Sequence, residues 1–266
     1  MGRLYPTKNQ EELLAKHFGC VRYIYNHCLN LKTEIYQTEE KSISAYDLIN
    51  RVTLLKKEEE TKWLKEVNSQ SLQAAIKNLD VAFTNFFRKH SKYPNFKSKH
   101  RKQSFSCPQH CNVDFESGKT YIPKFREGIK TVFHRDFEGK VKTCTISKTQ
   151  TGKYYISILI DDGIEQPELE EPLKEKCLGI DLGISHYCID SEGNKTDNPK
   201  HLKKRVKKLK REQRKLSRKV KGSNNRHKQK KKLAIVHEKV ANTRKDFLHK
   251  LSHKIAENQS YNYVAM

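Results

Sequence analysis

The sequence contains no long apolar segment. Of its 266 residues, 35% are hydrophobic and 32% are charged. No run approaches the roughly 20 apolar residues that a membrane-spanning helix requires, so the composition excludes an integral membrane protein. The opening residues, Met1 to Pro6, contain no apolar core of a secretory signal, and we do not expect export.

Acidic residues and regularly spaced cysteines are also scarce. The chain has 31 Asp and Glu against 54 Lys and Arg, a formal net charge of +23. Its seven cysteines are an odd number without the spacing of a disulfide framework, which is typical of reduced thiols in a cytoplasm. The positive excess indicates a polyanionic partner, most simply nucleic acid, and argues against an enzyme that acts only on small metabolites. We therefore expect a cytoplasmic, nucleoid-associated protein.

Nearly all of the excess charge lies in residues 200–254. This segment contains 23 Lys or Arg and only three acids, Glu212, Glu238 and Asp246, a net charge of +20. Residues at steps of three and four predict two amphipathic helices, with seams at Leu202, Val206, Leu209, Gln213, Leu216 and Val220 and at Leu233, Val236, Val240, Phe247, Leu251 and Ile255. Turn-forming residues at 221–225 separate the seams and predict an antiparallel hairpin.

A charge run of this kind is usually a solvated surface or a disordered tail. The two apolar seams argue against disorder, and charge of a single sign argues against an ordinary surface helix. We therefore predict that the hairpin contacts nucleic-acid phosphates. The candidate residues are Lys203, Lys204, Lys207, Lys208, Arg211, Arg214, Arg218, Lys228, Lys231, Arg244 and Lys245.

The first 90 residues carry helical patterns. Thr7 and Gln10 have the spacing of a capping box, which predicts a helix start. Apolar residues then recur at helical spacing, and Gly19 is expected at a joint between two helices. A helix-turn-helix is one interpretation of this region, although any small helical bundle gives the same pattern.

A β-rich region follows from Tyr93. Runs at 131–137, 141–147 and 153–160 have strand composition, and glycines stand between them where turns are expected. They predict a small antiparallel sheet or barrel. The acidic, proline-containing stretch 165–176 has the composition of a linker and marks a domain boundary.

One motif could carry chemistry. Asp181 stands between Gly179 and Gly183 in an apolar strand pattern. A carboxylate in such a strand normally needs a partner, and the glycines would let a large group approach it. A phosphate held on Mg²⁺ would satisfy both conditions. The alternative is an aspartate that caps a turn at the end of a strand.

Several blocks resemble the TnpB (OrfB) family of insertion-sequence proteins, which have a RuvC-like nuclease domain related to the type V CRISPR effectors. The similarity spans essentially the whole chain, with the blocks in the family's order. The matching blocks are Arg3–Gln10, Val21–Asn26, Trp63–Val67, Leu72–Gln73, Leu79, Asn85–Phe87, Pro94–Lys97, Ser104–Phe105, Gly179–Ile184, Lys232–Ala234 and Arg244–Ser252.

The resemblance implies an α+β multi-domain fold. Residues 1–92 would form a helical recognition (helix-turn-helix) lobe, and 93–164 a small wedge-like antiparallel β-barrel that binds RNA together with the first few residues. Residues 165–176 would be the linker. Residues 177–266 would form an incomplete RNase H-like (RuvC) α/β domain that includes the basic hairpin.

The resemblance also implies partners and sites. Family members are RNA-guided DNA endonucleases, so a guide RNA and a DNA target are expected, and a companion transposase from the same element is a further candidate partner. By this resemblance, the protein would read a short flanking DNA motif while the guide would read the target. By position, Ser69, Gln70, Gln73 and Ser106 would read that motif. Asp181 would be catalytic and would bind Mg²⁺.

The sequence departs from the family in its acids. The family uses three, and only Asp181 is found here; residues 261–266 resemble the start of the strand that carries the second. The zinc ribbon is absent, and Cys107 and Cys111 with His110 are too few for a zinc site. We therefore expect a C-terminally truncated protein that binds RNA and DNA and cuts poorly. The alternatives are a nuclease completed by a second chain and a non-catalytic repressor or RNA-stabilising module.

Overall fold

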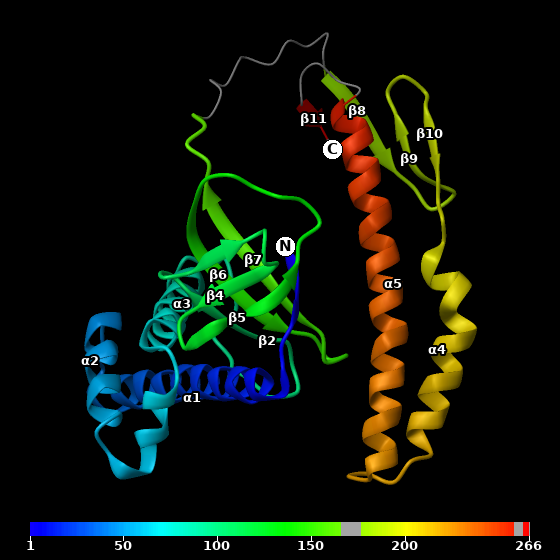
Figure 1. Cartoon of the computed structure of the whole chain (residues 1–266). Coiled ribbons are helices and arrows are strands. Elements are labelled where there is room, and N and C mark those ends of the chain that lie inside the picture. The colour runs from blue at the N-terminus through cyan, green and yellow to red at the C-terminus, as the bar shows by residue number, and fades with distance from the viewer. Residues whose placement is uncertain (166–176, 258–262, 266) are drawn as a thin grey trace. The chain divides into compact units, whose positions relative to one another are not determined.

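The structure, a computed structural model, describes residues 1–165, 177–257 and 263–265. The side chains of Cys177, Lys204, Glu257 and residues 263–265 lie outside this description. The chain divides into two compact units, Met1–Ile164 and Glu165–Met266 (Figure 1). Apart from Glu165, the linker predicted at 165–176 lies outside the described residues.

The first unit opens with a short strand and a series of helices. These are β1 (Gly2–Tyr5), α1 (Lys8–Glu39), α2 (Ala45–Leu55), the 3-10 helix η1 (Glu59–Glu66) and α3 (Ser69–Phe87). The predicted capping box is confirmed: the Thr7 hydroxyl accepts a hydrogen bond from the Gln10 N–H, and the Gln10 side chain accepts one from the Thr7 N–H. The pair fixes the start of α1 by satisfying amides that the helix leaves free.

The joint expected at Gly19 is wrong, because α1 runs unbroken through this residue. Nothing lies within 4 Å of the position that a Cβ would take there. Phe18, Cys20 and Val21 are all buried around it. Their burial offsets the cost of about 1 kcal/mol that a glycine adds to a helix interior.

Seven strands form the antiparallel sheet of the first unit, in the order β2-β6-β7-β1-β5-β4-β3. The strands after α3 are β2 (Gln103–Cys107), β3 (Asn112–Asp114), β4 (Lys119–Ile122), β5 (Phe125–Val132), β6 (Lys140–Lys148) and β7 (Tyr154–Asp161). The sheet is visibly curled (Figure 1). Its edge strands β2 and β3 do not pair with each other in the described part of the chain, so the sheet is an open, curled one where we expected a barrel.

The predicted runs at 141–147 and 153–160 are confirmed as β6 and β7. The run at 131–137 is wrong, since β5 ends at Val132, where it pairs with Arg3 of β1. Beyond that point the aromatic side chains pack on one another: the ring of Phe133 meets Phe115 at 5.4 Å and Phe137 at 6.0 Å. Aromatic residues raise the strand propensity of this segment, but here they serve a side-chain cluster.

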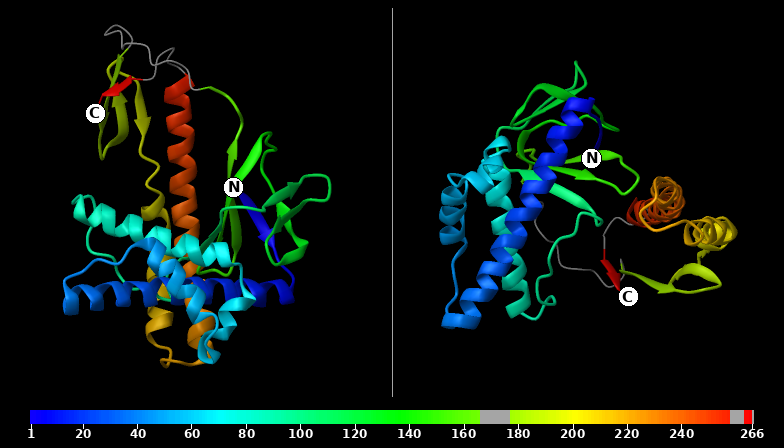
Figure 2. Two further views of the ribbon diagram at one scale, coloured as in Figure 1. Left: turned by 90° about the vertical axis from the view of Figure 1, so that its left-hand side faces the viewer. Right: turned by 90° about the horizontal axis from the view of Figure 1, so that it is seen from below.

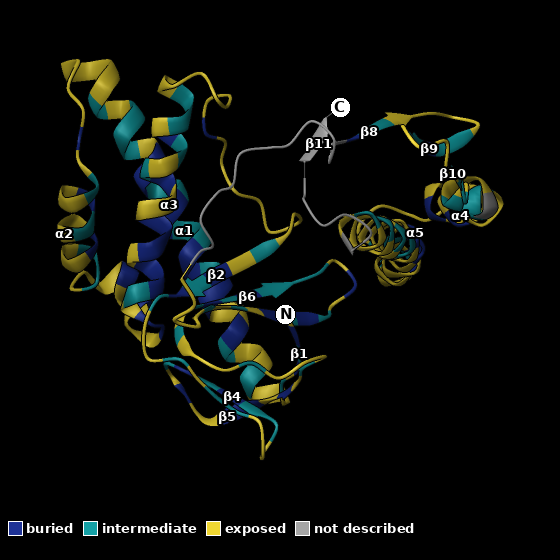
Figure 3. Ribbon diagram, turned by 90° about the horizontal axis from the view of Figure 1, so that it is seen from above, coloured by how far each residue is buried: buried dark blue, intermediate teal, exposed yellow. Residues whose placement is uncertain are grey.

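One hydrophobic core joins α1, α3 and the sheet. Leu14 and Ile24 of α1, Ile76 of α3 and Ile146 of β6 are fully buried in it. Buried residues of α1 and α3 lie where these helices face each other, and exposed residues cover their outer sides (Figure 3). The helices and the sheet of the first unit therefore share a single core.

The second unit contains a four-stranded sheet in the order β10-β9-β8-β11. Its elements are β8 (Cys177–Leu182), β9 (His186–Asp190), β10 (Lys195–Asp197), α4 (His201–Ser217), α5 (Asn224–Glu257) and β11 (Tyr263–Ala265). The first three strands are antiparallel, and β11 returns parallel to β8 with Ala265 opposite Gly179. A parallel return needs a crossover, which α4 and α5 provide. The strand expected near the end of the chain is confirmed for 263–265.

Candidate nucleic-acid interface

The predicted basic hairpin is confirmed, because α4 and α5 lie side by side (Figure 2). Leu216 from α4 and Leu233, Val236 and Val240 from α5 are buried between them. The predicted seam of α5 is confirmed at these positions. The packing holds two strongly basic helices together without any need for opposite charges on their outer faces.

The seam predicted for α4 is partly wrong. Leu202 is 50% exposed, Val220 is 76% exposed and Gln213 is exposed, whereas Glu212 is buried. Gln229 of α5 explains the difference: its side-chain amide donates to the Glu212 carboxylate over 2.7 Å and to the Glu212 carbonyl over 3.2 Å. A buried carboxylate needs such partners, and these fix the register of the two helices.

The basic side chains lie on the outside of this hairpin. Lys204 has no described side chain, and all ten of the other predicted contact residues are exposed. Among the described residues, Arg211 is the only one of the ten with an acidic partner, Glu212, at 3.5 Å. The remaining nine carry charge that no acid neutralises in the described part of the chain, as expected of a surface that meets phosphates.

Four of these residues form one stripe. With about 3.6 residues per turn, steps of four and three keep side chains on one face of a helix. The same spacing places Glu212 and Leu216 on the opposite, buried face of α4. The stripe consists of Lys207, Arg211, Arg214 and Arg218.

Glu212 also makes the stability of the hairpin depend on pH. Its hydrogen bond from Gln229, together with Lys215 and Arg211, lowers the pKa of the Glu212 carboxyl. A lowered pKa in the folded state stabilises the hairpin fully above the ordinary glutamate range, near 4.3, and the contribution disappears as the pH falls through the lowered value. We expect Glu212→Ala to lower the melting temperature of the hairpin at pH 7, followed by circular dichroism, and to flatten its acid dependence. Gln213→Ala changes the next residue, which is exposed, and is the control. An equal fall of the melting temperature in both variants would contradict the role of Glu212.

Asp181 lies on β8 opposite Ile189 of β9. The sequence predicted that a carboxylate in this apolar strand needs a partner, but the Asp181 side chain is exposed and makes no hydrogen bond or ion pair with any described residue. The local backbone explains why residue 183 is a glycine: a Cβ there would lie 3.0 Å from the His186 carbonyl oxygen in the turn to β9. Gly179 has more room, since a Cβ would meet only Ser191 at 3.6 Å.

Asp181 therefore has the exposure that a ligand of a metal or a phosphate-bound cation requires. However, the described part of the chain contains no group of three or more His, Cys, Asp or Glu side chains that could hold a metal ion. These residues alone do not fit a magnesium centre. The Mg²⁺ role of Asp181 stays a prediction.

Three of the four residues predicted to read a DNA motif lie at the start of α3. The Ser69 hydroxyl accepts a hydrogen bond from Lys56, Gln70 donates to Gln109, and Gln73 is exposed. Ser106 lies on β2, where its hydroxyl is 3.0 Å from that of Thr145 on β6. The structure thus brings Ser69, Gln70 and Gln73 together and turns Ser106 toward a neighbouring strand.

Beside them the structure adds Cys144 to Cys107 and Cys111, which the sequence already grouped. Cys144 of β6 is the register partner of Cys107 on β2, and Cys111 completes the group. The hydrogen bond with Cys111 and burial raise the pKa of Cys107. For Cys111, the hydrogen bond with Cys107 lowers the pKa, but the bond with Cys144 and burial raise it to about 12 overall. Both thiols therefore stay protonated at neutral pH and are poor nucleophiles.

The sequence also did not indicate a pocket between β9, the start of α4 and α5. Its aromatic members, Tyr187 and Phe247, are 60 residues apart, and only the crossover by α4 and α5 brings them together. Phe247 was expected in the seam of α5 and is only half-buried. The helical spacing of the α5 seam could not show that the Phe247 ring packs against Tyr187.

Two family models match the chain. Residues 161–265 match the OrfB model of the IS605 type, described as a probable transposase. Residues 2–41, which form β1 and α1 and extend just past them, match the helix-turn-helix domain model of the same family. A putative RNA-guided DNA endonuclease of Streptomyces pristinaespiralis is 38% identical over 97% of this chain and 64% of its own length. The putative RNA-guided DNA endonuclease InsQ of Escherichia coli K12 is 33% identical over 97% of this chain and 63% of its own.

The chain belongs to the OrfB (TnpB) family of insertion-sequence proteins. It spans just under two thirds of the length of those two relatives. A virulence protein, VsdF of Salmonella dublin, is 37% identical over 37% of this chain and 91% of its own length. A CRISPR-Cas12f ternary complex solved by cryo-EM aligns with 94% of this OrfB chain and 61% of that chain, at 15% identity and a TM-score of 0.36, which is too low to establish a shared fold. Among the described residues, no helix of the OrfB chain is long and apolar enough to cross a membrane.

Proposed function

We propose that this chain binds a guide RNA and its DNA target as an OrfB-family, RNA-guided protein. The observation that carries the proposal is the outer surface of the α4–α5 hairpin, where nine predicted contact residues stand exposed without an acidic partner in the described part of the chain. The two relatives described as RNA-guided DNA endonucleases supply the class of nucleic acid. A companion transposase and association with the nucleoid belong to the same proposal.

The strand arrangement of the second unit supports a RuvC-like, RNase H-like fold. Three antiparallel strands are followed by a helical crossover and by a fourth strand parallel to the first. In this interpretation β8 is the first strand of the RuvC-like domain, and Asp181 is the acid that the family places on that strand. Asp181 would then be one ligand of Mg²⁺, which would supply stabilisation of charge on a phosphodiester.

Binding is tested by titrating the purified chain with single-stranded RNA at several salt concentrations. With about 6–10 phosphate contacts, the affinity should fall roughly 10³- to 10⁵-fold between 50 and 200 mM salt. We also expect the chain to purify with bound RNA. Binding that is weak and insensitive to salt would refute the proposal.

The alternative is a non-catalytic module that represses a target or stabilises RNA. The absence of a metal-holding group among the described residues favours it over cleavage by these residues alone. The two functions differ at Asp181. Mg²⁺-dependent cleavage of a guide-matched DNA that disappears in Asp181→Ala supports the nuclease, whereas intact binding without cleavage in the wild type supports the module.

A further inference from the structure

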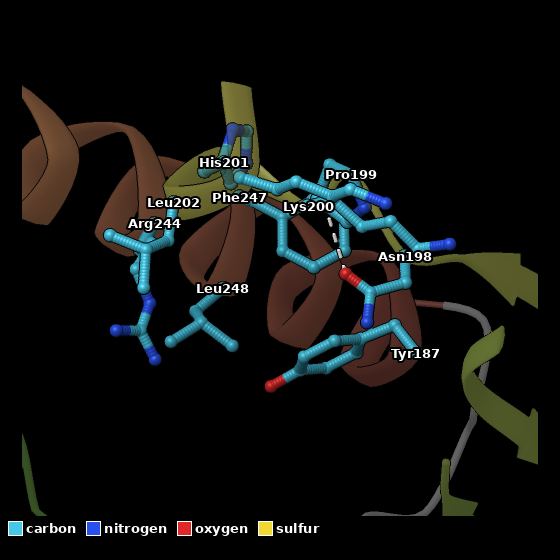
Figure 4. A pocket seen from close by; sticks show the side chains of 10 residues that line it. Tyr187, Asn198, Pro199, Lys200, His201, Leu202, Arg244, Phe247 and Leu248 are labelled. Carbon is cyan, nitrogen blue, oxygen red and sulfur yellow. Dashed lines mark hydrogen bonds between the residues drawn. The ribbon is translucent and has the colours of Figure 1, made fainter. Parts of the chain in front are cut away.

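The second unit contains a pocket with no role in the function proposed above. It has a volume of about 400 Å³ and lies between Tyr187 of β9, the residues that lead into α4, and α5 (Figure 4). Pockets for small organic groups span roughly 300–1,000 Å³, so this one is at the small end of that range. This volume is large enough for one planar ring system and the atoms that attach it to a chain.

Aromatic rings form one part of the lining. The rings of Tyr187 and Phe247 are 5.1 Å apart and meet edge to face at 88°. The His201 ring lies 5.8 Å from Phe247 on another side. Phe247 is held by both neighbours, so the aromatic part of the pocket is already in place before any ligand binds.

The rest of the lining is apolar with a cationic rim. Leu202 and Leu248 line the pocket although they are 50% and 43% exposed, in the most basic segment of the chain. Lys200, Lys203 and Arg244 surround them, and the lining contains no acid. Apolar side chains in contact with water amid so many charges indicate a surface that a ligand covers.

Asn198 and His201 also line the pocket. The Asn198 side chain donates to the Ile184 carbonyl over 3.2 Å and accepts from the Lys200 N–H over 3.0 Å, so it is fixed in place. The Nε2 atom of His201 is buried and has no hydrogen-bond partner among the described residues. A buried ring nitrogen without a partner costs free energy.

We propose that this pocket takes one unpaired nucleobase from the nucleic-acid strand bound by the hairpin. The base would stack on Tyr187, and its flanking phosphate would lie against Arg244 and Lys203. Aromatic rings beside cations are what proteins use to hold single-stranded nucleic acid, since every base has a π-face. The inference rests on the proposed function, because the strand must first be bound.

The test uses the full chain and three probes about 20 units long: oligo-U, oligo-dT and an abasic deoxyribose-phosphate strand. We expect Tyr187→Leu to weaken binding of the base-carrying strands roughly 5- to 150-fold, with an unchanged salt slope. Tyr187→Phe keeps the ring and should bind like the wild type. The abasic strand should not distinguish the three proteins. A larger effect with oligo-U than with oligo-dT would assign the pocket to RNA, and the reverse to DNA.

Arg244→Gln gives a second measure, because it should lower the salt slope by about one. If Tyr187→Leu and the wild type bind oligo-U and oligo-dT with equal affinity, the pocket does not bind a base, while the proposed function stays intact. An equal loss by Tyr187→Leu on the abasic strand would lead to the same conclusion, because the ring would then act without any contact to a base. Failure of the wild type to bind any probe in a salt-dependent way would overturn the proposed function itself.

Discussion

Replacing the stripe of α4 by glutamine should weaken nucleic-acid binding on the order of 10²- to 10³-fold at about 100 mM salt, because each lost phosphate contact also loses the release of a counterion. The quadruple variant changes Lys207, Arg211, Arg214 and Arg218. All four are exposed on the side of α4 away from α5, so the buried seam is left intact. The salt slope of binding should fall by about four, one for each contact. Fluorescence anisotropy with a labelled RNA over a salt series measures both quantities.

A matched variant separates the place of the charges from their number. Lys41, Lys57, Lys62 and Lys65 are exposed lysines in the first unit, and changing all four to glutamine removes the same charge. This control should keep most of the affinity and most of the salt slope. Equal losses in the two variants would mean that net charge alone drives binding, and the hairpin would not be the interface.

The features that sequence predicted well depend on neighbours in the chain. The capping box at Thr7 involves residues three apart, and the turn at 221–225 needs only its own glycine, serine and asparagines. The basic hairpin followed from the same local logic. Physical causes that act within one helical turn are visible in a sequence without knowledge of the fold.

The seam of α4 shows where this logic ends. Gln213 fits the apolar stripe better than Glu212, and so the predicted face was rotated by part of the roughly 100° that separates neighbouring residues on a helix. Gln229, which is 17 residues from Glu212 in the chain, decides the outcome through its hydrogen bond. Nothing in the spacing of α4 alone could reveal a partner on another helix.

The pairing of strands that are far apart in the chain could likewise not be predicted from the sequence. Residues 3–5 of β1 pair with β5 and residues 2–4 pair with β7, more than 120 positions away, and the pairing with β5 reaches its end at Val132. Asp181 is a related case. The apolar residues around it suggested that its carboxylate needs a partner, but the two faces of an antiparallel pair can differ in exposure, and Asp181 is on an exposed one. The candidate site was therefore predicted by residue type and not by environment.

Loss of His17 should strongly destabilise the first unit. It is fully buried, and its ring is 5.0 Å from Phe105 and 5.4 Å from Phe125. Nδ1 lies 2.8 Å from the Leu13 carbonyl and so carries the proton, while Nε2 accepts a hydrogen bond from the Asn68 N–H over 3.2 Å. Asn68 is the N-cap of α3, so the ring ties the start of that helix to α1 and to the sheet.

We expect His17→Ala to cost about 3–5 kcal/mol, because it opens a cavity and leaves the buried Asn68 N–H without an acceptor. In a unit of this size that loss lowers the melting temperature by roughly 6–20 °C. Differential scanning calorimetry measures it. His90→Ala, at an exposed position, should stay within about 0.5 kcal/mol of the wild type. Similar melting of the two variants would show that the His17 contacts contribute little.

The same residue should make stability fall in mild acid. Burial lowers the pKa of His17, with Lys124 adding to this and the Leu13 hydrogen bond opposing it. The folded state therefore favours the neutral ring, whose Nε2 is the acceptor that Asn68 needs. Its contribution is complete above the ordinary histidine pKa of about 6.5 and is lost as the pH falls toward the lowered value. In His17→Gln, which can still accept a hydrogen bond but does not titrate, the free energy of unfolding should depend less on pH as the pH falls below about 6.5. An unchanged pH dependence in that variant would assign the acid sensitivity to other groups.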